Sequence, residues 1–294
     1  MSVKARLIPV LLLKNGLLVR SEDFQTHQII GNPYNEVARF NQWNVDELVY
    51  LDITREGEHD LRRDDLKHHN STNFLDILEN LSLKCFMPLT CGGRIRSIQD
   101  MRERFLRGAD KVIVNTQAVR TPSILEKAAS VFGRQAVVLG MDVKCVNGSE
   151  QVCIACGQEP TGLDPVQWAQ NAEKLGAGEI LLQRIERDGK GLGYDTDLIQ
   201  KVTRAVNIPV IACSGVGQFT DYAAGIRAGA SAVAAANIWH FKELSDRQGK
   251  RALHEAGINV RLPFSTDSRP KRRRQARPKR QSPPFDFKQE TILA

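Results

Sequence analysis

The sequence predicts an α/β protein of the (β/α)8 TIM barrel class, in which eight parallel strands alternate with helices around a closed sheet. Short runs rich in Val, Ile and Leu alternate with longer amphipathic stretches, which is the pattern of buried parallel strands and crossover helices. Eight such units fit within about 260 residues, the usual size of this barrel. The two halves of the chain also resemble each other. A doubly wound open sheet is the alternative.

The apolar runs place the strands, and the amphipathic stretches place helices between them. Strands are expected over residues 7–12, 47–52, 86–91, 111–114, 136–141, 179–182, 210–212 and 232–235. Helices are expected over residues 35–43, 98–107, 123–131, 165–175, 196–206 and 219–228. The barrel is therefore expected to occupy residues 1–262, with residues 263–294 as a separate C-terminal tail.

A two-fold internal repeat relates the two half-barrels. Glu47-Leu-Val-Tyr-Leu resembles Glu179-Ile-Leu-Leu-Gln, and each segment lies in the second predicted strand of its half. The same overlay places Leu12 opposite Asp142. The first half therefore has no ionisable group at the position that Asp142 occupies in the second half.

The distribution of charge bears on nucleic-acid binding. The chain carries a net charge of +7, but residues 263–294 hold nine basic and three acidic residues, so +6 lies in the tail and +1 in the rest. The tail is rich in charge and proline, and we expect it to be disordered. Charge alone would allow nonspecific contacts with nucleic acid or anionic lipid. A solvated extension explains the tail at least as well, and no nucleic-acid partner is expected.

Composition excludes several other classes. The longest apolar run, residues 7–13, is shorter than the roughly 20 residues that a membrane-spanning helix needs. Lys14 follows it where a signal peptide would have its cleavage site, so a cytoplasmic protein is expected. The cysteines are too sparse for a disulfide framework. The lone pair Cys153 and Cys156 lacks the partners of a metal site, as do the histidines in residues 55–73, so neither a metal nor a cofactor is expected.

Small residues follow the predicted strands at the end where such barrels build their active sites. Glycine lets backbone N–H groups approach a ligand closely, and small polar residues bind phosphate oxygens. One such cluster lies in each half, so a substrate with a phosphate at each end would fit. The clusters contain Gly93, Asn115 and Thr116 in the first half, and Asp188, Gly189, Gly215 and Ala236 in the second. Turn geometry alone also explains single glycines, so the recurrence carries the argument.

Four charged residues lie at or near the opposite ends of the predicted strands. Arg6, Glu47, Lys111 and Glu179, here called the charged ring, lie at or near the starts of four strands, where the stability face of a barrel lies. Position alone favours a set of salt bridges that stabilises the barrel.

Longer motifs recur in an order that is specific to one family. They are Asp46-Glu-Leu-Val-Tyr-Leu-Asp-Ile-Thr54, Leu106-Arg-Gly-Ala-Asp-Lys-Val112, Leu175-Gly-Ala-Gly-Glu-Ile-Leu-Leu182, Arg187-Asp-Gly189, Gly193-Tyr-Asp195 and Ile258-Asn-Val-Arg-Leu262. Over residues 3–262 the chain resembles the cyclase subunit of imidazole glycerol phosphate synthase. This subunit is the ammonia-using half of a glutamine amidotransferase in histidine biosynthesis. Its reaction closes the ring of phosphoribulosyl-formimino-AICAR ribonucleotide, giving imidazole glycerol phosphate and AICAR.

The resemblance implies a heterodimer with a glutaminase subunit, which docks on the N-terminal face and passes ammonia through the barrel. It assigns the charged ring to the gate at the ammonia entrance and Asp110 to the docking surface. It assigns the two strand-end clusters to the phosphate groups of a phosphorylated ligand. Finally, it makes Asp142 one of two carboxylates that act as general acid and base.

The first of these two carboxylates, at the end of the first strand, is missing. The family pattern of apolar residues followed by Asp, Val, Lys, Asp and Gly is present here as Val10-Leu-Leu-Leu-Lys-Asn-Gly16, so Leu12 occupies the place of the acid. A general acid or base contributes about 10² to 10⁴ in rate, so the change predicts slow ring closure. Four further residues replace family residues on this face: Arg20, Arg94, Ser214 and Asn237.

These departures favour a paralogue of the histidine enzyme. A subgroup of the family, found beside glutaminase-like proteins in bacterial surface-polysaccharide pathways, also has a Leu-Leu-Leu-Lys run and is associated with amidation of nucleotide sugars. The sequence therefore predicts a subunit that receives ammonia and relays it to a sugar-amidating enzyme. An ordinary histidine-pathway cyclase with altered acid–base groups is one alternative. A non-catalytic scaffold that binds a phosphorylated ligand is another.

Overall fold

The computed structural model describes residues 3–43, 45–54 and 73–262. Most of the segment with clustered histidines and the whole of the basic tail lie outside the described residues.

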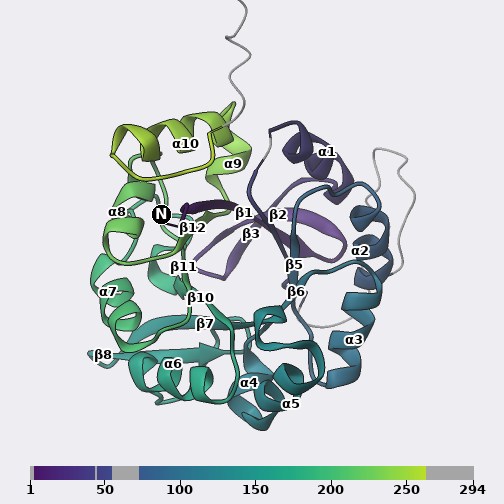
Figure 1. Ribbon diagram of the computed structural model, residues 1–294, viewed down its shortest axis with the longest axis vertical. Helices are drawn as coiled ribbons and strands as arrows, with labels where there is room; N and C mark the ends of the chain where they lie inside the picture. The colour runs from purple at the N-terminus through teal and green to yellow at the C-terminus, as the bar shows by residue number, and fades with distance from the viewer. Residues whose placement is uncertain (1–2, 44, 55–72, 263–294) are drawn as a thin grey trace, which may run out of the picture. The chain divides into compact units, whose positions relative to one another are not determined.

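Eight parallel strands close into a barrel, as the sequence predicted (Figure 1). Each strand pairs with the next, β10 also pairs with β7, and β12 pairs with β1, so the sheet has no open edge among these eight. The doubly wound alternative is therefore wrong. The barrel strands are β1 (Arg6–Lys14), β4 (Leu48–Asp52), β5 (Leu89–Gly92), β6 (Lys111–Val114), β7 (Val137–Val146), β10 (Glu179–Arg184), β11 (Val210–Cys213) and β12 (Ala232–Ala235).

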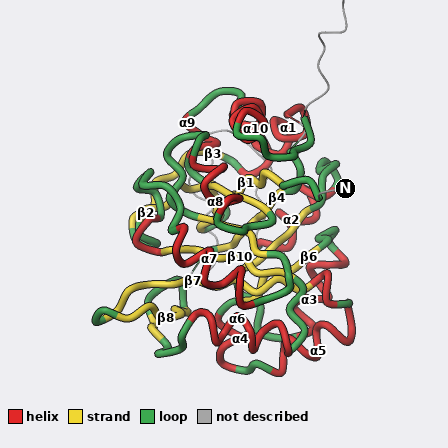
Figure 2. The backbone as a smooth tube through the Cα atoms, turned by 60° about the vertical axis from the view of Figure 1, so that its left-hand side comes forward, coloured by secondary structure: helices red, strands yellow, loops and turns green. Residues whose placement is uncertain are grey.

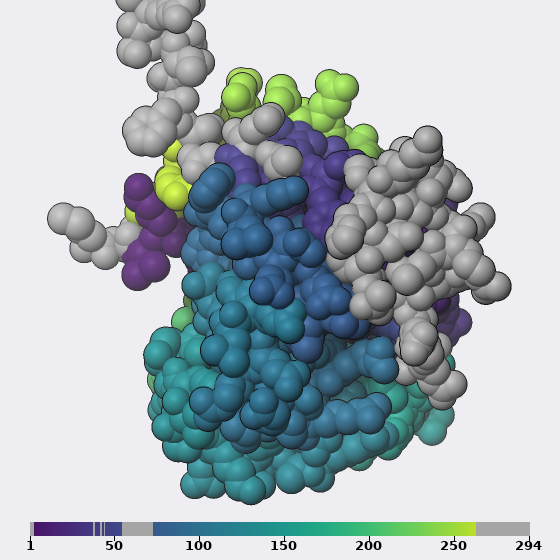
Figure 3. Space-filling model, turned by 90° about the vertical axis from the view of Figure 1, so that its right-hand side faces the viewer, coloured from purple at the N-terminus to yellow at the C-terminus, as the bar shows by residue number. Residues whose placement is uncertain are grey.

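Helices surround the strands (Figure 1). They are α1 (Pro33–Trp43), α2 (Phe74–Ser82), α3 (Ile98–Leu106), α4 (Thr116–Arg120), α5 (Ser123–Phe132), α6 (Pro165–Lys174), α7 (Thr196–Ala205), α8 (Asp221–Arg227), α9 (Ile238–Phe241) and α10 (Ser245–Glu255). In Figure 3, the segment coloured blue to teal, which contains α2 to α5, makes up much of the described surface facing the viewer. Among the described residues, no helix has the length and apolar character to cross a bilayer.

Helix ends follow from local capping. In α3, the Ser97 side chain accepts a hydrogen bond from the backbone of Asp100, whose carboxylate accepts one from the backbone of Ser97. In α6, the Asp164 side chain accepts from Val166 and Gln167, and Pro165 stands in the first turn, where its missing N–H costs nothing. These caps fix where each helix starts relative to the strand before it.

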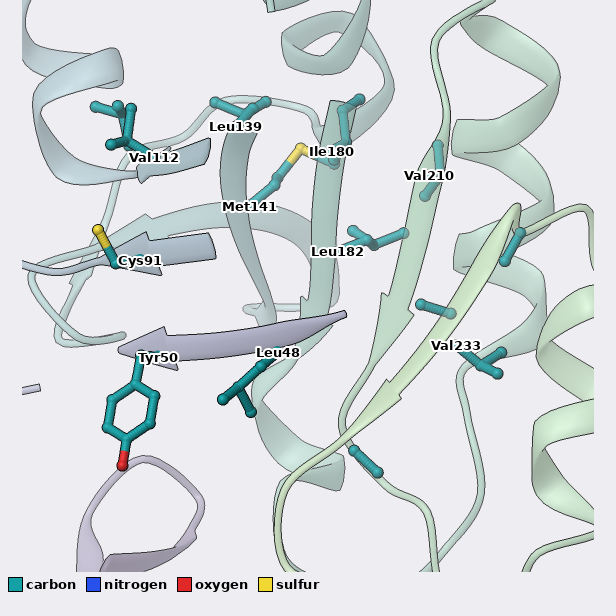
Figure 4. Close-up of a cluster of buried hydrophobic side chains, with 14 of the residues drawn as sticks. Leu48, Tyr50, Cys91, Val112, Leu139, Met141, Ile180, Leu182, Val210 and Val233 are labelled. Carbon is teal, nitrogen blue, oxygen red and sulfur yellow. The ribbon is translucent and has the colours of Figure 1, made fainter. Parts of the chain in front are cut away.

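Side chains along each strand alternate between the barrel interior and the outer helices. In β1, Ile8 and Val10 belong to the interior cluster, while Leu7 and Leu11 belong to the cluster that includes the helices. Figure 4 shows the outer set, in which side chains such as Leu139 project from the barrel strands. Burying one such side chain stabilises the fold by about 1.5 to 3 kcal/mol.

An antiparallel hairpin follows the first strand of each half. β2 (Leu17–Glu22) and β3 (Thr26–Gly31) extend from β1, and β8 (Ser149–Ile154) and β9 (Glu159–Pro160) extend from β7 (Figure 2). The sequence analysis missed both hairpins. Each begins at an Asn-Gly pair in the left-handed conformation, Asn15-Gly16 and Asn147-Gly148, which is a strong hairpin signal. The shared hairpins agree with the two-fold repeat.

One predicted strand begins too early. The expected strand at residues 86–91 starts instead at Leu89, and the Phe86 side chain is 88% exposed. Pro88 has no N–H to donate to the sheet, so pairing starts only after it. The Phe86 side chain therefore lies on the surface of the barrel and is not part of its core.

Candidate functional site

A cavity of about 690 Å³ lies at the carboxyl ends of the barrel strands. Apolar residues of the barrel interior, including Val10, Leu12 and Leu181, form part of its lining. The strand-end loops of both halves supply the rest. The structure brings all the predicted strand-end residues to this cavity: Gly93, Asn115, Thr116, Asp142, Asp188, Gly189, Gly215 and Ala236.

Asp142 is one of three buried carboxylates in the described lining of this cavity, with Asp52 and Asp188, and 6% of its surface is exposed. It accepts hydrogen bonds from the Asn115 Nδ2 at 2.9 Å and from the Gln183 Nε2 at 3.0 Å. Burial raises the pKa of Asp142 to about 7, because the two amide bonds only partly offset the loss of hydration and Asp188 adds repulsion. A group with this pKa can both take up and release a proton near neutral pH.

Gln183 was missed from the sequence. It continues the inward alternation of β10 after Leu181, so counting every second residue along this strand would have placed Gln183 beside the site.

Leu12 and Asp142 occupy equivalent places in the two halves. Leu12 pairs with Val19 of its hairpin, and Asp142 pairs with Cys153 of the other hairpin. The Leu12 side chain packs in the apolar interior and is 8% exposed. The cavity therefore has an ionisable group on the β7 side and an apolar surface at the matching point of β1.

The first-half cluster is built around a close approach of the chain to itself. Gly93 has φ +100°, and a Cβ there would lie 2.0 Å from the Asp52 carbonyl oxygen, so only glycine fits. Thr116 Oγ1 accepts a hydrogen bond from the Ala155 N–H at 3.0 Å, and its own hydroxyl proton stays available. Asn115 is bound to Asp142, so its amide is shared between the carboxylate and the predicted phosphate cluster.

The second-half cluster holds the β2–β3 hairpin. Asp188 Oδ2 accepts from the Ser21 hydroxyl at 2.7 Å and from the Phe24 N–H at 3.3 Å. Burial raises the pKa of Asp188 despite these bonds. A Cβ on Gly189 would lie 2.3 Å from the Ser21 carbonyl oxygen, so glycine is needed for the hairpin to dock. Gly215 has φ +93° and a similarly close contact with Gly193.

The four residues that were expected to replace family residues adopt different roles. Arg94 and Ser214 keep the left-handed backbone that suits glycine, with φ values of 54° and 72°. Arg94 lines the cavity, whereas the Arg20 guanidinium lies over the Phe241 ring, 5.6 Å from its centroid. Asn237 binds the hairpin through its side-chain amide.

The charged ring closes at the amino ends of the strands. Arg6 binds Glu47 at 2.7 Å and also binds Glu179. Lys111 binds Glu47 at 3.0 Å and Glu179 at 2.8 Å, so each carboxylate bridges both cations. Glu47 and Glu179 are buried. Burial alone raises the pKa of Glu47, but Lys111 and Arg6 outweigh it and hold that pKa below its ordinary value.

Asp110 lies outside the ring. It is exposed, and its carboxylate accepts the Leu89 N–H at 2.7 Å at the start of β5. The described residues hold no cluster of ligands suited to a metal ion.

A closed barrel with a cavity at the carboxyl ends of its strands, lined by apolar side chains and a few polar groups, defines the class of (β/α)8 proteins with a strand-end ligand site. Residues 6–245 match the family described as histidine biosynthesis protein. The imidazole glycerol phosphate synthase subunit HisF of Pyrobaculum aerophilum is 40% identical over 264 residues, which cover 89% of this chain and 100% of that protein. HisF of Alkaliphilus metalliredigens is 40% identical over 261 residues, which cover 88% of this chain and 99% of that protein. The chain belongs to the HisF family, which confirms the resemblance found in its motifs.

Proposed function

We propose that this chain is an ammonia-using synthase subunit of the imidazole glycerol phosphate synthase cyclase type. It forms a heterodimer with a glutaminase subunit that supplies the ammonia. The observation that carries this proposal is the closed charged ring at one end of an apolar barrel interior whose other end opens into the strand-end cavity.

The interior suits neutral ammonia. Between the charged ring and the cavity lie apolar side chains such as Ile8, Val49 and Val138. Moving an ion through such a layer is far more costly than moving a small neutral molecule, because a charge loses much more hydration energy than a neutral polar group. The charged ring acts as the gate, since an opening of one ion pair admits ammonia without leaving any carboxylate free of a cation.

The glutaminase docks at the amino ends of the strands. Asp110 lies there, and three apolar side chains that lie just before β5 or at the end of α3 are strongly exposed: Leu83, Phe86 and Leu106, at 75%, 88% and 77%. A group of exposed apolar side chains beside a charged residue is typical of a protein interface. Burying them against a partner would place that partner over the charged ring.

The ammonia is relayed to a partner that amidates a nucleotide sugar, with a phosphorylated ligand bound in the cavity. Leu12 supports this finer proposal, since the ring closure of the family uses two proton-transfer groups. Asp142 supplies one group with a pKa near neutrality, but the equivalent place holds an alkyl side chain. Ring closure in the cavity itself would therefore be slow.

The test supplies the chain with ammonium chloride at pH 8.5 and the family ribonucleotide, and measures formation of AICAR. The wild type is expected to turn over at least about 100-fold more slowly than HisF of Alkaliphilus metalliredigens. Leu12→Asp should raise the rate at least about tenfold, and Leu12→Asn is the matched control, because it is polar but exchanges no proton. A wild type as fast as the relative would contradict the relay.

That contrary result would favour the second candidate, an ordinary histidine-pathway cyclase. One observation supports it: Asp142 is held by both Asn115 and Gln183 with a pKa of about 7, so it is able to serve in turn as base and acid.

A further inference from the structure

The cavity has four sides, which alternate around the barrel. In the closed sheet, β5 and β6 lie between β4 and β7, and β11 and β12 lie between β10 and β1 (Figure 1). Gly93, Asn115 and Thr116 follow β5 and β6, and Gly215 and Ala236 follow β11 and β12, so the two predicted phosphate clusters lie opposite each other. A ligand that reaches from one cluster to the other therefore presents one edge to β1 and β4 and the opposite edge to β7 and β10.

Leu12 and Leu51, here called the leucine pair, form the side at β1 and β4. They are register partners on neighbouring strands, and both line the cavity. Leu51 and Ile53 pack against the apolar interior and keep part of their surface exposed. Asp52 also contributes to the lining, but it alternates to the other face of β4, where it accepts the Thr54 N–H at 3.0 Å. The inward side chains on this side therefore offer a ligand no hydrogen bond.

Asp142 and Gln183, here called the polar pair, form the opposite side at β7 and β10. They are also register partners, and the Gln183 Nε2 donates to the Asp142 carboxylate at 3.0 Å. Asn115 donates to the same carboxylate, but its buried Oδ1 has no hydrogen-bond partner among the described residues. A buried acceptor without a partner is costly, so a ligand hydroxyl that donates to Asn115 Oδ1 would be favoured. This side therefore suits the hydrogen-bonding edge of a ligand.

The internal repeat makes the two pairs equivalent in backbone position. The overlay of the two halves places Leu12 opposite Asp142 and Leu51 opposite Gln183. The same barrel geometry thus carries two leucines on one side and a hydrogen-bonded pair on the other. A hydroxyl buried against the leucine pair would lose its hydrogen bonds to water, whereas a methyl group there would gain from burial. The leucine pair therefore selects an apolar group.

We infer that the cavity takes a phosphorylated sugar that carries an acylated amine on one edge and free hydroxyls on the other. The methyl group of the acylated amine packs against the leucine pair, and the hydroxyls bind Asn115 and the polar pair. The phosphates are left to the two predicted clusters. The inference rests on the proposed use of this cavity as a site for a phosphorylated ligand, and it names the class of ligand.

Calorimetric titration of the full-length chain compares α-D-glucose 1,6-bisphosphate with N-acetyl-α-D-glucosamine 1,6-bisphosphate. Both sugars carry a phosphate at each end, and they differ only at C2, where the second sugar has an acetamido group in place of a hydroxyl. The wild type should bind the acetamido sugar about tenfold more tightly, because that sugar buries a methyl group against the leucine pair and leaves no hydroxyl unpaired there.

Leu12→Asn changes the leucine pair at nearly constant side-chain size and adds an amide that can bind a hydroxyl. It should reduce the preference for the acetamido sugar to about twofold or less. Binding of the glucose bisphosphate should stay as tight or become tighter, so the same titration shows that the variant is folded. Leu12→Met, which stays apolar, should keep the preference. Leu192→Asn is the second control: it makes the same exchange at a leucine that is 64% exposed and lies outside the lining of this cavity.

Three results would overturn the inference. They are a wild type that binds the glucose bisphosphate as tightly as the acetamido sugar, a Leu12→Asn variant that keeps the full preference, and no binding of either sugar at millimolar concentration. The titration uses neither ammonia nor a glutaminase. The expected preference in a chain that closes the ring as fast as HisF of Alkaliphilus metalliredigens would contradict only the proposed relay. Slow ring closure without the preference would contradict only this inference.

Discussion

The two ends of the barrel interior shift the pKa of a buried carboxylate in opposite directions. In the charged ring, Glu47 lies between Arg6 and Lys111, and its pKa is held below the ordinary value. In the cavity, Asp142 is bound only by amide groups, and burial raises its pKa to about 7. Both side chains are almost fully buried. The comparison teaches that the partner, a cation or an amide, decides whether a buried carboxylate is a fixed charge or a proton carrier.

The largest expected effect follows from breaking the charged ring. Glu47→Gln leaves Arg6 and Lys111 to share Glu179 alone, so a partly buried cation loses its partner. Breaking a buried pair typically costs about 3 to 5 kcal/mol, and we expect about 3 kcal/mol because Arg6 is partly exposed. Urea unfolding of the full chain at pH 7 measures the loss.

Glu255→Gln is the control for this variant. It breaks the pair between Arg251 and Glu255, which is exposed on α10, and should leave the midpoint of unfolding unchanged. The lowered pKa of Glu47 means that its stabilisation is complete above the ordinary value of 4.5 and is lost as the pH falls through the lowered one. If the loss in free energy of unfolding caused by Glu47→Gln stays constant down to pH 2, then Glu47 is not the ionised partner of Arg6 and Lys111.

An effect of similar size but opposite sign is expected at Asp142. Its folded pKa of about 7 is above the ordinary 3.8, so ionisation destabilises the fold, and stability falls as the pH rises between these values. Asp142→Asn should therefore raise the free energy of unfolding at pH 8 by about 2 to 4 kcal/mol, with no difference below pH 3.8. Asn115 Oδ1 has no partner among the described residues, so an amide flip lets it accept from the new side chain.

The measurement for Asp142→Asn is a series of urea titrations between pH 4 and pH 9. Asp197→Asn, an exposed carboxylate in the first turn of α7, is the control and should show no such rise with pH. If the wild type and Asp142→Asn unfold with the same pH dependence, then Asp142 has an ordinary pKa and the contrast with Glu47 fails.

The barrel and its two ends could be predicted from the sequence, because the alternation of apolar and amphipathic stretches locates the start and end of each strand. Arg6, Glu47, Lys111 and Glu179 were predicted at one end because they lie at or near the starts of predicted strands, and Asp142 was predicted at the other by the family resemblance. The contacts that distinguish the two strand-end clusters were not predictable in this way. Ser21 and Asp188 are 167 positions apart, and only the closed barrel brings the hairpin to that carboxylate. No local pattern marks Ser21 as a residue that contacts Asp188.

The smallest expected effect separates two cavity residues that have a left-handed backbone, Arg94 and Ser214. Arg94→Gly relieves a left-handed backbone at an exposed position and should stabilise the chain by about 0.5 to 1 kcal/mol. Ser214→Gly gives the same relief, but Ser214 Oγ accepts the Arg184 N–H at 2.8 Å and donates to a carbonyl oxygen. Losing that bridge costs about 1 kcal/mol, so the net change should be close to zero. Urea unfolding of both variants measures the difference. Equal gains would show that the Ser214 bridge contributes nothing, and the side chain would then serve only the shape of the cavity.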